Sequence, residues 1–108
     1  MDRDTSPTGV GRRLKALRKV GGFNNQKAFA EIIGVTAARY NHWEKGGQHR
    51  LPVEYAIKIM ALTGAELNYI YLGEVRGIPA SLVVLLKEHF KSAEQNVIVP
   101  QRRVGSRC

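Results

Sequence analysis

Apolar side chains recur every three or four positions along most of this chain, and a glycine interrupts each run. Such spacing is typical of amphipathic helices, and glycine is a residue that readily ends one. The first predicted helix ends before Gly21 and has its apolar face at Val10, Leu14, Leu17 and Val20. Shorter helices are predicted within residues 26–33, 36–45, 51–63 and 67–72, each followed by a glycine. A sixth, from Pro79 to about Lys91, carries an apolar stripe of Leu82, Leu85, Leu86 and Phe90.

These elements predict an all-α fold, a compact bundle of five to six short helices around one core. Residues 1–8 are polar and lack periodicity, so we expect a flexible N-terminal arm. Residues 9–73 form the main domain, and residues 74–91 add a helix that either seals the core or dimerises, with equal support for each. Residues 92–108 are expected to be a disordered tail, although Val97-Ile98-Val99 could add a short strand.

Composition excludes several classes of protein. No apolar run approaches the roughly 18 residues of a membrane-spanning helix, and the N-terminus lacks the apolar stretch of a secretory signal. We therefore expect a cytoplasmic protein without a membrane partner. Neither the single Cys108 nor the histidines (His42, His49 and His89) have metal-ligand spacing, so no metal or cofactor is expected. No nucleophile and base stand at a motif spacing, which argues against an enzyme.

The charge is strongly basic and unevenly distributed. The formal net charge is +8. Residues 10–50 hold nine basic and two acidic side chains, whereas residues 51–91 hold four of each sign. One half of a small domain thus carries nearly all the attraction for phosphate, which favours a nucleic acid as the partner.

The segment from Gln26 to Gly46 combines this charge with a characteristic geometry. Two short predicted helices are joined by a tight turn at Gly34, and the small Ala30 permits their close approach. Tyr40 and Trp43 lie three positions apart and are expected to pack in the core, in preference to stacking on bases. An ordinary helical hairpin is the alternative, but motif and charge together favour a DNA-binding helix-turn-helix.

This segment and its surroundings resemble the XRE/Cro family of helix-turn-helix regulators over about residues 10–73. The matching motifs are Arg13-Leu14-Lys15-Ala16-Leu17-Arg18, Gln26, Ala30, Gly34-Val35-Thr36 and Trp43-Glu44-Lys45-Gly46. The resemblance implies that Gln26 contacts a phosphate and braces the recognition helix, and that Arg18 pairs with Glu44. The connection before Gln26 is about one residue longer than usual, and two recognition positions hold alanine, where relatives often carry larger polar residues.

Helical geometry identifies the surface expected to face DNA. At about 100° per residue, one face of the third helix holds four candidate base-reading residues: Ala37, Ala38, Asn41 and His42. Tyr40 and Trp43 point away from that face and are assigned to structural support with Arg18 and Glu44. The candidate phosphate contacts are Gln26, Lys27, Thr36, Arg39, Lys45 and Arg50. Additional phosphate or minor-groove contacts are expected from Arg3, Arg12 or Arg13.

The predicted function is a sequence-specific regulator of transcription, a repressor or autoregulator, that binds double-stranded DNA. We expect it to place the helix at 36–45 in the major groove. By analogy it acts as a homodimer on a pseudo-palindromic site, with the segment from Ala65 to Gly73 as the candidate interface and Tyr69 or Tyr71 as its anchor. The alternative is a protein-interaction module, such as an antitoxin or anti-activator, that uses the same fold to bind a protein partner.

Overall fold

The computed structural model describes residues 3–47 and 50–98. Six helices make up its regular structure: α1 (Pro7–Val20), α2 (Gln26–Ile33), α3 (Ala37–Lys45), α4 (Val53–Thr63), α5 (Leu67–Leu72) and α6 (Ala80–Ile98). The described residues contain no strand, so the predicted all-α fold is confirmed. None of the helices in these two ranges is long and apolar enough to cross a membrane.

Short polar side chains begin the first three helices. Ser6, Asn25 and Thr36 have extended backbones, and each side chain accepts a hydrogen bond from a backbone N–H of the first helical turn. Gly34 and Gly46 end α2 and α3 with φ of 86° and 76°, the left-handed conformation that residues with a Cβ rarely adopt. The caps and the glycines thus set where the two helices of the helix-turn-helix start and stop.

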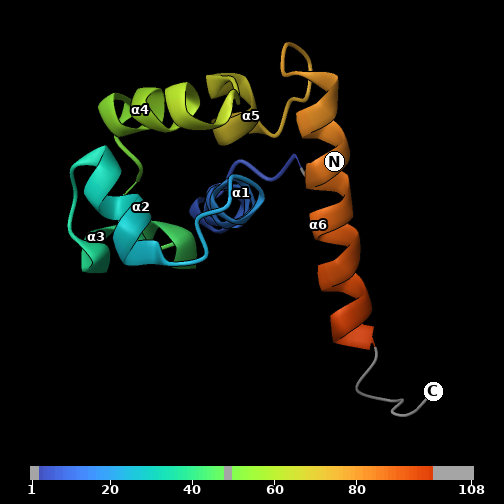
Figure 1. Cartoon of the computed structure of the whole chain (residues 1–108), viewed down its shortest axis with the longest axis horizontal. Coiled ribbons are helices and arrows are strands. Elements are labelled where there is room, and N and C mark those ends of the chain that lie inside the picture. The colour runs from blue at the N-terminus through green and yellow to red at the C-terminus, as the bar shows by residue number, and fades with distance from the viewer. Residues whose placement is uncertain (1–2, 48–49, 99–108) are drawn as a thin grey trace.

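Helix α1 lies at the centre of the molecule and is seen nearly end-on in Figure 1. Helices α2 and α3 lie on one side of it, α4 and α5 cross beside them, and α6 lies on the opposite side of α1 from α2 and α3 (Figure 1). Helix α1 packs against α3, α5 and α6 and therefore connects the two sides of the fold.

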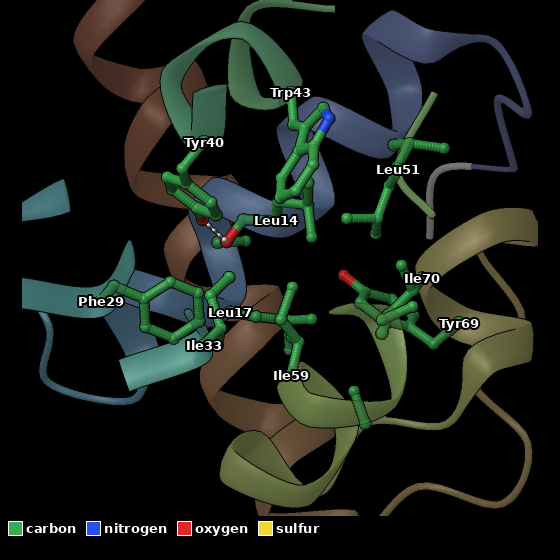
Figure 2. Packing of buried hydrophobic residues seen from close by; sticks show 14 of the residues in the cluster. Leu14, Leu17, Phe29, Ile33, Tyr40, Trp43, Leu51, Ile59, Tyr69 and Ile70 are labelled. Carbon is green, nitrogen blue, oxygen red and sulfur yellow. Dashed lines mark hydrogen bonds between the residues drawn. The ribbon is translucent and has the colours of Figure 1, made fainter. Parts of the chain in front are cut away.

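The core joins all six helices around Leu14 and Leu17 of α1, which are fully buried (Figure 2). A series of aromatic rings runs through it at centroid distances of 5.1 to 6.2 Å, each ring beside the next: Phe23, Phe29, Tyr40, Trp43 and Tyr55. These rings come from the α1–α2 loop, α2, α3 and α4. Edge-to-face and tilted contacts of this kind favour particular ring orientations, so they fix how the helices lie against one another.

From Arg3 onward the N-terminal segment is attached to the domain, which corrects the expectation of a flexible arm for residues 3–8. Ser6 caps α1, and Pro7 begins it. Arg3 forms an ion pair with Glu74 at 2.9 Å, and the backbone carbonyl of Asp4 accepts a hydrogen bond from Arg13 at 2.7 Å. Met1 and Asp2 lie outside the described residues.

Helix α6 seals the core and is longer than predicted. Leu82 and Leu86 are buried, whereas Leu85, which belongs to the predicted apolar stripe, is 47% exposed. The helix continues past Lys91 to Ile98, so a disordered tail does not begin at Ser92, and Val97 and Ile98 form no strand. Residues 99–108 of the expected tail lie outside the described residues.

Candidate nucleic-acid interface

Helices α2 and α3 meet across a three-residue turn that the backbone itself fixes. Gly34 donates to the carbonyls of Ala30 and Glu31, and Val35 donates to that of Ala30. Thr36 then starts α3, because its hydroxyl oxygen accepts from the backbone N–H of Arg39 at 3.1 Å. With Phe29 and Ile33 of α2 and Tyr40 of α3 fully buried, the inner sides of the two helices are held in the core. The outer side of α3 is left for a ligand.

The four predicted base-reading residues share the outward side of α3. Ala38 and His42 are exposed, and Ala37 and Asn41 are half-buried. Glu44, the sole acidic residue of α3, points inward, and Lys45 is exposed. The outward face of the helix is therefore small, polar and cationic. That combination suits contact with the acceptor-rich floor and phosphate walls of a DNA groove.

Most predicted phosphate-contacting side chains are also at the surface: Lys27, Thr36, Arg39, Lys45 and Arg50. Gln26 is half-buried at the start of α2. The Thr36 oxygen is used as a helix cap, but a hydroxyl also has a proton to donate, and phosphate oxygens accept such protons. Gln26 and Lys27 lie at the start of α2, Thr36 and Arg39 at the start of α3, and Lys45 and Arg50 at or beyond its end.

Arg39 is held in a defined position by aromatic side chains. Its guanidinium carbon lies 5.3 Å from the centre of the Trp43 ring and 5.3 Å from that of Tyr55. Such cation–π contacts restrict a long side chain at little cost, since a stacked guanidinium keeps its N–H donors available at the edge. Arg39 is thus oriented at the border between α3 and α4, before any ligand arrives.

A buried ion pair lies beneath the outward face. Arg18 Nε donates to Glu44 Oε2 at 2.7 Å, and both side chains are only 4% exposed. Arg18 also donates to the backbone carbonyls of Phe23 and Asn24 at 2.8 and 2.9 Å. Gln26 Nε2 donates to Glu44 Oε1 at 2.8 Å. The predicted Arg18–Glu44 pair is therefore present, and Gln26 joins it, which links α1, the start of α2 and α3.

The protonation of this network follows from its surroundings. Burial opposes ionisation of Glu44, but hydrogen bonds from Arg18 and Gln26 outweigh it and hold the pKa of the carboxyl below its usual range. Burial, followed by the charge of Glu44, raises the pKa of the Tyr40 hydroxyl. The pair is thus charged at neutral pH, and Tyr40 keeps its proton, which it donates to the carbonyl of Leu14 at 3.4 Å (Figure 2).

A family model described as helix-turn-helix, HTH_3, matches residues 14–70. That match covers more than half of the chain and spans the region from α1 into α5. The chain belongs to the HTH_3 family. This is a DNA-binding helix-turn-helix domain of the XRE/Cro type, a kind of domain that is typically non-catalytic. No curated protein and no solved structure matches the chain.

Of the three arginines predicted to contact phosphate or the minor groove, Arg13 is buried, whereas Arg3 and Arg12 are exposed and form ion pairs at the surface. Arg13 is fully buried, and its guanidinium donates to the carbonyls of Asp4, Ile70 and Tyr71 at 2.7 to 3.2 Å. Arg12 pairs with Asp4 at 3.2 Å, and Arg3 pairs with Glu74. Each of these cations is engaged within the domain. Arg13 serves the attachment of α1 to the end of α5, where the helix dipole favours a positive charge.

Two lysines of the HTH_3 domain were missed by sequence reasoning. Lys15 and Lys19 of α1 are exposed and line a cleft of about 310 Å³ together with Asn41 and Lys45 of α3. Their spacing of four residues places them on one side of α1, and that spacing was the available signal. The sequence does not reveal that this side of α1 faces α3.

Of the two predicted dimer anchors, one is buried and the other is half-buried. Tyr69 is 1% exposed, and the hydroxyl of the half-buried Tyr71 donates to the carbonyl of Leu51 at 2.7 Å. Within the candidate segment from Ala65 to Gly73, the large apolar residue that remains exposed is Leu72. Tyr69 and Tyr71 therefore serve the core.

Among the described residues no group of three potential metal ligands occurs.

Proposed function

We propose that this chain is a sequence-specific, cytoplasmic regulator of transcription, a repressor or autoregulator, that places α3 in the major groove of double-stranded DNA. One observation carries the proposal: the outward side of α3 is small and cationic, while its single carboxylate is buried against Arg18. A helix presented in this way meets base edges without repulsion from the phosphates around them.

On this proposal, direct contacts to bases contribute only modestly to specificity, because few side chains of α3 can make them. Ala37 and Ala38 offer methyl groups to thymine, Asn41 offers an amide to adenine, and His42 offers a ring nitrogen to a guanine acceptor. A large share of the binding free energy then comes from phosphate contacts, with further selectivity from the shape of the groove.

The proposal includes a homodimer on a pseudo-palindromic site, because two copies of a weakly reading face discriminate better than one. Equivalent recognition helices would then lie about 34 Å apart. Exposed Leu72, Val84 and Leu85 leave apolar surface on α5 and α6 for such contact. Sedimentation equilibrium with and without a selected duplex tests this part by itself: one copy per duplex would remove the dimer but leave DNA binding intact.

The central test is binding to duplex DNA over a range of salt concentrations, followed by selection of bound sequences from a random pool. Affinity for random duplex should fall steeply, with a log–log slope of about −0.9 for each phosphate neutralised. A flat slope would refute DNA binding and would favour a protein-interaction module.

Two matched variants test the assignment of α3. His42→Ala should change the selected bases near the middle of each half-site, whereas Lys45→Ala should weaken all sequences to a similar extent. Lys87→Ala, on the exposed side of α6, is the control. If neither α3 variant differs from this control in affinity or selected sequence, the recognition helix lies elsewhere.

A further inference from the structure

Positive charge is concentrated in a cleft between α1 and α3. It has a volume of about 310 Å³, and three lysines line it: Lys15 and Lys19 from α1 and Lys45 from α3. Asn41 and Gln26 contribute polar amides to the same cleft. Both are residues of the helix-turn-helix, so the cleft opens beside the surface proposed to meet DNA.

The acid that lines this cleft is already neutralised. Glu44 contributes to the wall, but its carboxylate receives hydrogen bonds from Arg18 at 2.7 and 3.3 Å and from Gln26 at 2.8 Å. Arg18 and Glu44 cancel as charges. The three lysines therefore leave the cleft with three uncompensated positive charges from its lining residues.

A second observation shows that the field of Lys15 and Lys19 reaches across α1. Burial, then the charges of Lys19 and Lys15, lower the pKa of His89 on α6. A neighbouring imidazole thus resists protonation partly because these two cations are close. An anion between the lysines would relieve the repulsion that they exert on each other.

We propose that this cleft binds a backbone phosphate group of the DNA duplex that α3 reads, with Lys15 and Lys19 as phosphate-contacting residues that act together with Lys45. This inference rests on the proposed function. Ammonium groups suit the role because they act as mobile point charges that follow a phosphodiester without demanding one geometry. The cleft thereby extends the contact from α3 to α1 and holds the recognition helix at a defined depth.

The experiment compares a double variant, Lys15→Gln with Lys19→Gln, with the unchanged full chain. Binding of a fluorescent duplex of random sequence is measured between 50 and 200 mM salt. Loss of the cleft phosphate should make the log–log slope shallower by about 0.9, the contribution of one neutralised phosphate. Over that range the ratio of the affinity of the unchanged chain to that of the double variant should then shrink by roughly 3.5-fold, which is the fourfold change in salt raised to the power 0.9.

The matched control removes two lysines from another surface, Lys87→Gln with Lys91→Gln. Both residues are exposed on α6, and at about 100° per residue each lies roughly 160° around the helix from His89, away from Lys15 and Lys19. The control loses the same net charge, so a general effect of charge would change both double variants equally. Thermal unfolding of each variant verifies that it is folded.

A second readout needs no substitution. Brief acetylation of lysines, read by mass spectrometry, should show Lys15 and Lys19 protected by bound duplex, with Lys87 and Lys91 modified as in the free protein. Equal slopes for the two double variants, or equal labelling of the four lysines, would overturn the cleft proposal while DNA binding stands. Failure of the unchanged chain to bind duplex would instead overturn the proposed function.

Discussion

Replacing Glu44 with alanine tests the idea that a buried ion pair holds α3 in place. The substitution removes the carboxylate to which Arg18 Nε donates and leaves the guanidinium beside α1, only 4% exposed. The carbonyls of Phe23 and Asn24 still accept from Arg18, but no negative charge remains next to it. Gln26 also loses its partner at the start of α2.

The size of the effect follows from the burial of the pair. Breaking a buried ion pair by removing one partner costs about 3–5 kcal/mol, because the other charge remains desolvated. For a domain of this size, 1 kcal/mol corresponds to about 4–8 °C in Tm, so we expect a fall of at least roughly 12 °C. Glu44→Gln, which keeps the shape and one acceptor oxygen, should lose about 1.5–3 kcal/mol.

Urea unfolding at neutral pH measures these losses, and pH gives an independent check. The pKa of Glu44 is lowered in the folded state, so its contribution to stability is present at neutral pH and is lost as the pH falls through that lowered value. The difference between the unchanged chain and Glu44→Gln should therefore narrow in acid.

Glu74→Ala is the matched control, since its partner Arg3 is 67% exposed and a pair at the surface contributes at most about 1 kcal/mol. A loss for Glu44→Ala no larger than that of Glu74→Ala would refute the reasoning. So would a difference between the unchanged chain and Glu44→Gln that does not depend on pH.

Three other predictions follow from single contacts. Gly11→Ala would place a Cβ 2.4 Å from the carbonyl oxygen of Glu44, so α1 and α3 must separate, and urea unfolding should show a loss of at least about 1–3 kcal/mol. Burial and the charges of Lys19 and Lys15 lower the pKa of His89. The free energy of unfolding should therefore fall as the pH drops below about 6.5, because the unfolded chain then binds the proton more readily than the folded one. NMR titration should show a higher pKa of His89 in the double variant Lys15→Gln with Lys19→Gln than in the unchanged chain. Arg39→Lys exchanges a stacked guanidinium for an ammonium over Trp43 and Tyr55, and should cost about 0.5–1 kcal/mol and change the fluorescence of Trp43.

The helices themselves could be predicted because each carries local signals. Apolar spacing defined their inner faces, and Gly34, Gly46, Gly64 and Gly73 end α2 to α5 in the left-handed conformation. The contact between Arg18 and Glu44 was available only through family resemblance. The two residues are 26 positions apart, and nothing in the spacing of charges marks them as partners.

The parts that sequence reasoning missed depend on tertiary contacts. Arg13 reads as a surface cation, yet it is buried because the carbonyls of Ile70 and Tyr71 at the end of α5 accept its protons. Lys15 and Lys19 gain their role from the way in which α1 passes α3. Ser6-Pro7 is a local signal for the start of α1, a cap followed by a proline in the first turn, but the polar composition of residues 1–8 favours an arm instead.

The extension of α6 has a simpler cause. Residues 92–98 lack an apolar stripe, which is why a tail was expected there. Ala93, Glu94 and Gln95 nevertheless have high helix propensity, and a helix that has already been started on the core propagates readily through such residues.

Different residues of this fold set the position of α3 and supply the attraction for phosphate. Substitutions in the two groups should therefore affect DNA binding in different ways. The aromatic rings, the Arg18–Glu44 pair and the close contact at Gly11 fix the position of α3, while Lys15, Lys19 and Lys45 supply charge. Methyl groups of alanine discriminate only at contact distance, whereas an ammonium attracts phosphate over several ångströms. A variant that loosens α3 should therefore lower the ratio of specific to random affinity, and a variant that removes a cleft lysine should lower both affinities while preserving their ratio.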